Sequence, residues 1–329
     1  MKGDTCSKVK AETWFKHPAG ILISSLGATL LWGSALPVIK ISYEHFQIDS
    51  KNVFGEWVFA GYRFALAGLV LIALAIVMGQ TRRSDRKPLS MPRLIRLGFI
   101  QTFMQYLVLY AGLSFSSGIE GSILVGSTSL FQILSARMID KNEGLNPAKW
   151  FGLLLGFLGI LVMGFAQQGV QFNFGFGAVL LLASAAFGGF GNVLFRKESA
   201  NESVIALTGK QMLAGGLGLL LVGAVRSGFA PFHFDVKGWL LLAYLSVLSA
   251  AGFALWNTVM KYNTVGKVSL YLFLIPVFGV LLSAVLLDER VSAWIGLSLL
   301  LVVAGIIIVN RSGQSGRKKE VERNKDQRG

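Results

Sequence analysis

The chain is short of the residues from which enzymes and metalloproteins build their sites. It has one cysteine and three histidines in 329 residues. The single cysteine lies in the polar N-terminal tail and has no partner for an internal disulfide, and so few histidines make a structural zinc site improbable. The sequence also lacks an HExxH motif, a phosphate loop ending in Lys-Ser or Lys-Thr, and a Ser-His-Asp arrangement. It therefore predicts no catalytic set, metal or cofactor.

Charged residues are scarce as well. They make up 15% of the chain, against 53% hydrophobic residues and a mean hydropathy of +0.60. Soluble domains typically carry about 25% charged residues. The net charge of +14 might be taken for that of a nucleic-acid binder, but the basic residues fall in short loops and tails between apolar runs. The composition favours a lipid bilayer as partner and argues against nucleic acid.

Ten apolar runs are long enough to cross a membrane, which takes about 20 residues. They cover residues 20–39, 57–79, 97–115, 119–138, 150–166, 174–195, 204–225, 239–260, 268–287 and 291–309. The fourth is the weakest because polar side chains crowd it. Open strands would leave backbone groups unpaired in lipid, and the runs lack the alternation of a barrel. The sequence predicts an all-α membrane protein with ten transmembrane helices.

Lysine and arginine are distributed unevenly between the connections. The N-terminal tail, the loops after the second, fourth, sixth and eighth runs, and the C-terminal tail are rich in them, and the opposite loops are poor. Basic residues in short loops mark the cytoplasmic side. We therefore expect both termini in the cytoplasm. The first run is long enough to span, so we interpret it as a retained helix and not a removed signal peptide.

The two halves of the chain resemble each other. The segment 61–68 (GYRFALAG) aligns with 209–216 (GKQMLAGG), which places Arg63 over Gln211. The expected organisation is an N-terminal tail (1–19), a first five-helix repeat (20–166), a second (174–310) and a basic tail (311–329). Because five is odd, the second repeat must run through the membrane inverted. Inverted repeats are common in secondary transporters, with the substrate site between them, so the repeat favours a small-molecule transporter.

Several short motifs follow one another in a familiar order. They are WGSALP at 32–37, RF at 63–64, ALWN at 254–257, LIPV at 274–277 and LLDER at 286–290, followed by Trp294 and Gly296. In these the chain resembles the ten-helix EamA family of the drug/metabolite transporter superfamily, over roughly residues 20–310. The resemblance implies ten helices, cytoplasmic termini and usually export of amino acids, metabolites or toxic compounds. We expect helix kinks at Pro37 and Pro276, although Ser129-Leu130 stands where the family pattern would place the first-half counterpart of Pro276.

Polar side chains inside the runs are candidates for the substrate pathway because they are costly to bury in lipid. Arg63 would suit a carboxylate or phosphate, although snorkelling to the surface is the alternative. Snorkelling is the favoured interpretation for Lys210, whereas its neutral neighbour Gln211 is cheap to bury. Gln101 and Gln105 are spaced to share a helix face, where they would line a cavity or bond to a neighbouring helix.

Aromatic residues form a second candidate set. Tyr106 and Tyr110 share a face, and Trp32, Trp256 and Asn257 would contribute to an aromatic wall for an organic substrate, although interfacial belt or packing roles are usual for tryptophan. The carboxylates are less promising candidates for a role in transport.

Glu143 and Glu289 lie near expected helix starts, where acidic residues are favoured by the helix dipole alone. Glu120 is the one carboxylate considered for proton coupling. The prediction is a plasma-membrane secondary exporter of amino acids or small metabolites, driven by protons or an exchange substrate. The alternatives are an importer, a membrane-embedded enzyme or a non-transporting scaffold, and the sequence does not predict the oligomeric state.

Overall fold

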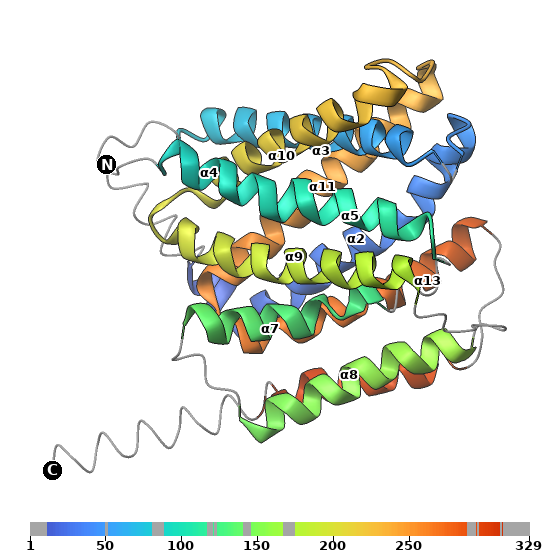
Figure 1. Ribbon diagram of the computed structural model, residues 1–329. Helices are drawn as coiled ribbons and strands as arrows, with labels where there is room; N and C mark the ends of the chain where they lie inside the picture. Colours follow the sequence, from blue (N-terminus) through green and yellow to red (C-terminus); the bar gives the residue numbers. More distant parts are fainter. Residues whose placement is uncertain are drawn as a thin grey trace, which may run out of the picture.

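The computed structural model describes residues 12–49, 52–80, 89–116, 121, 124–140, 146–166, 175–287, 294, 296–309 and 311, and every regular element within them is helical (Figure 1). The first half contains α2 (Pro18–His45), α3 (Val53–Val77), α4 (Met91–Gly98), the π-helical segment η1 (Phe99–Met104), α5 (Gln105–Leu113), α7 (Thr128–Ile139) and α8 (Pro147–Ala166). The second contains α9 (Phe176–Glu198), η2 (Ser199–Asn201), α10 (Val204–Ser227), α11 (Val236–Tyr262), α12 (Val265–Val268), the 3-10 segment η3 (Ser269–Phe273), α13 (Leu274–Leu287) and a last helix, Gly296–Val309.

Seven of the described helices are long and apolar enough to cross a membrane. They are Pro18–His45, Val53–Val77, Met91–Leu113, Phe176–Asn201, Val204–Ser227, Val236–Tyr262 and Val265–Leu286. Three shorter apolar helices, Leu124–Ile139, Pro147–Val162 and Gly296–Val309, overlap the remaining expected runs. The all-α membrane class is confirmed. The count of ten spans and the inverted relation of the halves stay predictions.

The outer surfaces of the helices are apolar. On α3, for example, Leu69, Val70, Leu74 and Val77 are exposed, whereas Phe64 is fully buried. A soluble protein rarely exposes so continuous an apolar surface, but lipid tails are its natural solvent. Helices α2, α3, α10 and α11 begin with a side-chain cap: at the start of α3, for example, the side chain of Asn52 accepts a hydrogen bond from Gly55 N. The sequence thus satisfies its backbone groups where the helices leave the apolar region.

Helices α3 and α10 pack backbone against backbone through what we call the glycine interface: Gly61 and Gly68 of α3 with Gly209, Gly216 and Gly223 of α10. A Cβ added at Gly216 would lie 2.6 Å from Ala65 N, and one added at Gly61 would lie 2.6 Å from Leu220 N. Small residues allow such close approach in membranes, where packing drives helix association. The segments that the sequence aligns as repeat mates are therefore in direct contact, and Figure 1 shows the two helices lying across each other.

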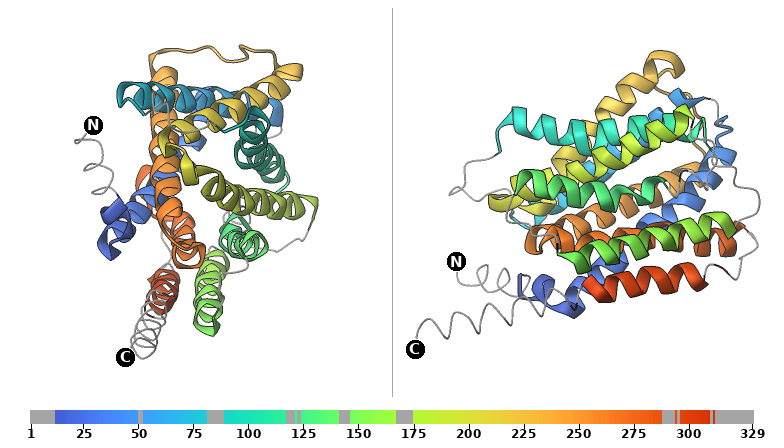
Figure 2. Two further views of the ribbon diagram at one scale, coloured as in Figure 1. Left: turned by 90° about the vertical axis from the view of Figure 1, so that its left-hand side faces the viewer. Right: turned by 60° about the horizontal axis from the view of Figure 1, so that its bottom comes forward.

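Helix α11 packs against both members of this pair and also against α2. Helix α9 packs against α5 and α7, and α13 also packs against α2. Figure 2 shows α8 and the last helix as a separate pair at the edge of the bundle. They approach closely at glycines, since a Cβ added at Gly152 would lie 2.8 Å from Gly305 O. The polar groups described below lie between the other helices.

Two spans are interrupted at comparable places. Leu124–Ile139 contains a turn at Ser127, and Val265–Leu286 passes through the 3-10 segment η3 before α13 begins at Leu274. Pro276 follows as the third residue of α13, where proline is tolerated. Pro37 is buried inside α2. The kinks expected at these prolines stay predictions. Discontinuous segments in corresponding positions of two halves are typical of transporter substrate sites.

Asp235, just before α11, gives the fold a pH-dependent contact. Its Oδ1 accepts a hydrogen bond from Gly238 N at 2.7 Å and lies 2.8 Å from Nε2 of His45 at the end of α2. The Gly238 N–H, and after it His45, hold the pKa of Asp235 below its ordinary value. The ionised carboxylate therefore stabilises the folded state above the ordinary pKa, and this contribution is lost as the pH falls through the lowered value.

We expect the melting temperature of the wild-type protein to fall more steeply on acidification below about pH 4 than that of Asp235→Asn, which keeps a cap oxygen but cannot titrate. Thermal unfolding followed by circular dichroism across this range measures the difference. Parallel curves for the two proteins would contradict the assignment.

Candidate functional site

Six polar side chains from five helical elements and η1 form a continuous buried group, which we call the amide network. Its members are Gln101, Gln132, Asn192, Thr208, Asn257 and Ser269. Five of them are 0% exposed and Asn192 is 6% exposed. The first two come from the first half of the chain and the other four from the second, so the network joins the halves.

Asn192 on α9 is the centre of the network. Its Oδ1 accepts a hydrogen bond from Gln101 Nε2 at 2.9 Å, and its Nδ2 donates to Gln132 Oε1 at 2.7 Å. Gln132 in turn donates from Nε2 to Ser269 Oγ at 2.7 Å. The chain of bonds thus runs from η1 through α9 and α7 to η3.

A second arm leads to α11 and α10. Asn257 Oδ1 accepts from Gln101 Nε2 at 3.5 Å, and its Nδ2 donates to Thr208 Oγ1 at 3.0 Å. A neighbouring pair links η1 to α10, where Thr102 Oγ1 donates to Gln211 Oε1 at 2.7 Å. These contacts involve residues of η1, α7, α9, α10, α11 and η3.

The network is not fully satisfied. Gln101 Oε1 in the network and Gln211 Nε2 in the neighbouring pair are buried with no hydrogen-bond partner among the described residues. Leaving such a group unpaired costs about 1–3 kcal/mol, and the cost is removed by a polar ligand or by a rearrangement that admits water. Gln101 and Thr102 lie in the π-helical turn η1, and π-helical turns frequently mark functional sites. The unpaired polar groups and the π-helical turn therefore make the network a candidate for the part of the bundle that changes conformation.

Gln132→Leu should lower the free energy of unfolding by about 1–3 kcal/mol, because it leaves Asn192 Nδ2 without its acceptor and takes one donor from Ser269 Oγ, which keeps only its bond to Val265 O. Thermal unfolding of the purified protein in detergent measures the loss. Gln105→Leu, at a half-buried glutamine outside the network, is the matched control and should have a smaller effect. Equal melting temperatures for the wild-type and Gln132→Leu proteins would contradict this account.

A second group, the arginine–aromatic cluster, lies beside the network. It consists of Trp32, Arg63, Phe64, Tyr106, Tyr110 and Phe253. The ring centroids of Trp32 and Phe253 are 5.1 Å apart, and those of Phe64 and Tyr106 are 4.3 Å apart. Such edge and tilted contacts make a rigid apolar wall.

Arg63 is the one cation of this cluster and is only 2% exposed. Its Nε donates to Ser249 Oγ on α11 at 2.6 Å, and its guanidinium carbon lies 4.9 Å from the centroid of the Phe64 ring. It also interacts with the Tyr110 hydroxyl. None of the ion pairs among the described residues includes it. A buried guanidinium without a carboxylate has donors to offer to an anionic group.

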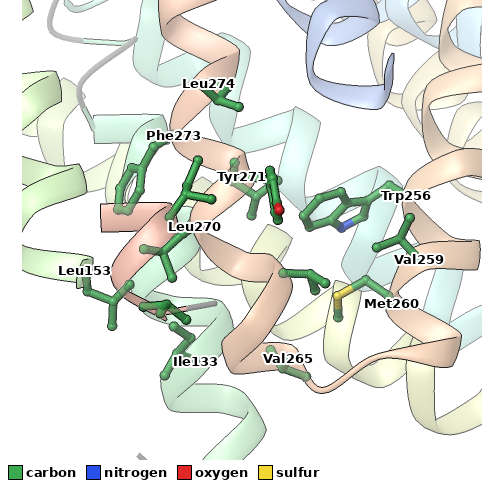
Figure 3. Close-up of a cluster of buried hydrophobic side chains, with 14 of the residues drawn as sticks. Ile133, Leu153, Trp256, Val259, Met260, Val265, Leu270, Tyr271, Phe273 and Leu274 are labelled. Atoms are coloured by element: carbon green, nitrogen blue, oxygen red, sulfur yellow. The ribbon is translucent and has the colours of Figure 1, made fainter. Parts of the chain in front are cut away.

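Trp256 connects the cluster to the largest apolar core. Its ring centroid lies 5.8 Å from that of Trp32, and it is fully buried beside Met260 and Tyr271 (Figure 3). The indole Nε1 atoms of both tryptophans are buried without a partner. Core packing explains most of the neighbours of Trp256. Two adjacent tryptophans whose buried indole N–H groups both lack an acceptor are nevertheless unusual for a core.

The structure brings most of the sequence candidates together. Trp32, Arg63, Tyr110 and Trp256 meet in or next to the arginine–aromatic cluster, and Asn257 and Gln211 take part in the amide contacts. Gln101 and Gln105 both face α9, because Cβ atoms added at Gly191 and Gly188 would touch them. Of these two only Gln101 joins the network. Lys210 is exposed and lies outside both groups.

Several residues of the site are absent from the sequence prediction. Gln132 and Asn192 are polar residues within expected spans, and Asn192 follows a run of glycines that leaves room for its neighbours. Glu56 falls one residue before the expected second span, which starts at 57, whereas α3 begins at Val53. Glu120, Glu143 and Glu289 lie outside the described residues.

Comparison with known proteins decides the family. The model of the EamA-like transporter family matches the chain twice, over residues 19–165 and 175–311. The chain belongs to the EamA-like transporter family. It is accordingly a multi-pass membrane transporter for a small-molecule substrate, as the sequence predicts.

Relatives of this EamA-like protein cover nearly its whole length. YvbV, an uncharacterized transporter of Bacillus subtilis, is 25% identical over 300 residues, or 87% of this chain and 90% of that protein. A probable amino-acid metabolite efflux pump of Escherichia coli is 24% identical over 295 residues, or 87% and 93%. A solved crystal structure matches with a TM-score of 0.73 at 20% identity, over 91% of this chain and 99% of that one, which shows a shared fold.

Proposed function

We propose that this transporter is a secondary exporter of amino acids or similar small organic carboxylates, working by alternating access in the plasma membrane with both termini in the cytoplasm. It acts without catalysis and comprises two inverted five-helix repeats, 20–166 and 174–310. The Lys/Arg distribution supports the orientation, and the name of the Escherichia coli relative supports the direction and substrate class.

The buried Arg63 carries the proposal. A lone cation in the apolar part of a bundle costs free energy unless a partner compensates it. Its contacts among the described residues are two hydroxyl groups, Ser249 Oγ and that of Tyr110, and the ring of Phe64. A substrate carboxylate supplies the negative charge that Arg63 lacks, through a bidentate pair of hydrogen bonds. The adjoining aromatic wall accommodates an apolar side chain of the substrate.

The amide network supports the mode of transport. It joins elements of both halves at a place where the fourth and ninth expected spans are interrupted. Alternating access requires two packings of similar free energy. Amide hydrogen bonds suit that requirement, because each contributes only about 0.5–1.5 kcal/mol and water replaces it readily. We assign the closing and opening of the cytoplasmic half of the pathway to this network.

A counterflow experiment tests the proposal. Proteoliposomes are loaded with an unlabelled amino acid, and accumulation of the labelled one from outside is followed for a panel that includes L-phenylalanine. Phenethylamine, the same molecule without its carboxylate, is the matched control. We expect saturable counterflow of at least one amino acid and none of its decarboxylated form. No counterflow across the panel would overturn the substrate class, and equal counterflow of the amine would overturn carboxylate recognition by Arg63.

Import is the second candidate, because alternating access itself is reversible. The direction follows from the gradient that drives accumulation in vesicles of known orientation. Inside-out membrane vesicles energised with a respiratory substrate should accumulate the amino acid if the protein exports it from the cell, and right-side-out vesicles should do so if it imports.

A further inference from the structure

Two charged side chains are buried inside the described spans, and both lie on one face of α3. Arg63 is 2% exposed and Glu56 is 5% exposed. They are separated by seven residues, two helical turns, with Ala60 between them on the same face. Each therefore faces the interior of the bundle at a different depth. The proposed substrate contact uses only the arginine.

Among the residues that the structure describes, the carboxyl group of Glu56 has no hydrogen-bond or ion-pair partner that explains its burial. Its Oε2 atom is buried and makes no hydrogen bond. It is not needed as a cap, because Asn52 Oδ1 already accepts the hydrogen bond of Gly55 N at this helix start. No ion pair among the described residues includes it. An unpaired buried carboxylate is unfavourable, and the group avoids the cost by binding a proton.

Few groups around Glu56 could compensate the negative charge of its carboxylate in place of a proton. The titratable or charged residues on the elements around it are Lys40, Tyr43, Glu44 and His45 of α2, Tyr62 and Arg63 of α3 itself, Tyr106 and Tyr110 of α5, Lys210 and Arg226 of α10, and Lys237, Tyr244, Lys261 and Tyr262 of α11. Tyr43 and Tyr110 interact electrostatically with both Glu56 and Arg63. Arg226 lies over the ring of Phe54, and the Tyr244 hydroxyl is bonded to Ser34. Tyr43 and Tyr110 thus link the Glu56 carboxyl to Arg63, the residue proposed to bind the substrate carboxylate.

We infer that Glu56 is a proton-binding site which couples export of the substrate to entry of one proton. The inference rests on the proposed exporter. With the expected orientation, Glu56 lies near the outer end of α3, so its oxygen gains a proton from external water when the site is open outward. The O–H bond breaks again when the site opens to the cytoplasm and the proton passes to water there. Through Tyr110, the charge of Glu56 and the occupancy of Arg63 influence each other.

The proton itself is detected by infrared spectroscopy of the purified full-length protein in lipid. At about pH 6 an exposed glutamate, with an ordinary pKa of about 4.3, is ionised. We expect a C=O band of a protonated carboxyl group in the wild-type protein at this pH and its loss in Glu56→Gln. Glu44→Gln, which removes an exposed carboxylate from α2, should retain the band. A band that is missing from the wild type, or that persists in Glu56→Gln, would overturn the inference.

Coupling is measured in proteoliposomes with an imposed pH gradient and L-phenylalanine, or whichever amino acid of the panel shows counterflow. In Glu56→Gln we expect counterflow to persist while gradient-driven accumulation falls to the level of protein-free vesicles. Accumulation equal to that of the wild type would overturn the inference. So would loss of counterflow together with accumulation, because Glu56 would then act in substrate passage and not in coupling.

The two proposals fail differently. If no amino acid moves through the wild-type protein, the proposed exporter is wrong, while the carboxyl band still decides whether Glu56 holds a proton. If counterflow is normal and the band is missing, the exporter stands and the proton site is wrong.

Discussion

Arg63→Ala is expected to lower the saturable counterflow of the amino-acid substrate by about 10- to 100-fold, because a charge-assisted hydrogen bond contributes about 1.5–3 kcal/mol. The loss should appear as a higher half-saturating concentration, since the guanidinium binds the carboxylate in the proposed site. Arg63→Lys keeps the charge but not the planar pair of donors, so we expect an intermediate flux. Initial rates over a range of substrate concentrations measure both effects.

Ser249→Ala tests whether the hydrogen bond that holds Arg63 matters for substrate binding. Ser249 Oγ accepts the hydrogen bond of Arg63 Nε and donates to Leu245 O, so the substitution frees the arginine without removing its charge. A moderate rise in the half-saturating concentration is expected.

Normal transport by Arg63→Ala would remove Arg63 from the substrate site, whereas an Arg63→Ala protein that no longer elutes as a monodisperse peak would show a structural role instead.

Gly216→Ala should be strongly destabilising, because it adds a methyl group at the contact between α10 and α3. The added Cβ would lie 2.6 Å from Ala65 N and 2.9 Å from Phe64 C, and both are backbone atoms that cannot rotate away. Overpacking of this kind typically costs about 1–3 kcal/mol. We expect the upper end of that range, with helices α3 and α10 forced apart. The free energy of unfolding in mixed micelles measures the effect.

Gly27→Ala is the matched control for Gly216→Ala. Its Cβ would meet only Leu255 Cδ1, at the ordinary contact distance of 3.6 Å. This substitution should be neutral or slightly stabilising, because alanine has the higher helix propensity. Equal stabilities of the two variants would show that the glycine interface is looser than described.

The helical architecture was largely predictable because a lipid environment leaves a chain few choices. Apolar runs, interrupted by basic loops, locate the spans to within a few residues. The error at the start of α3 has a specific cause. A hydropathy run stops at a charged residue, whereas the helix continues through Glu56 to the cap at Asn52. The second run expected from hydropathy therefore begins one residue after Glu56, the buried carboxyl of α3.

The candidate site was predictable in part. The sequence indicates which polar and aromatic residues are costly in lipid, and on that ground Arg63, Trp32 and Trp256 were selected. It does not show which helices are neighbours, and the amide network is a property of neighbours. Gln132 and Asn192 come from spans whose order in the chain gives no hint that their side chains meet 2.7 Å apart.

The glycine interface limits how the molecule can move. Where two helices touch largely through backbone atoms, few side chains between them can exchange one rotamer for another and permit sliding. Helices α3 and α10 must therefore travel as one rigid body, and insertion of a single residue into either would rotate its glycines out of register by about 100°. In the proposed alternating-access cycle, we expect this pair to stay together while the remaining helices move relative to it.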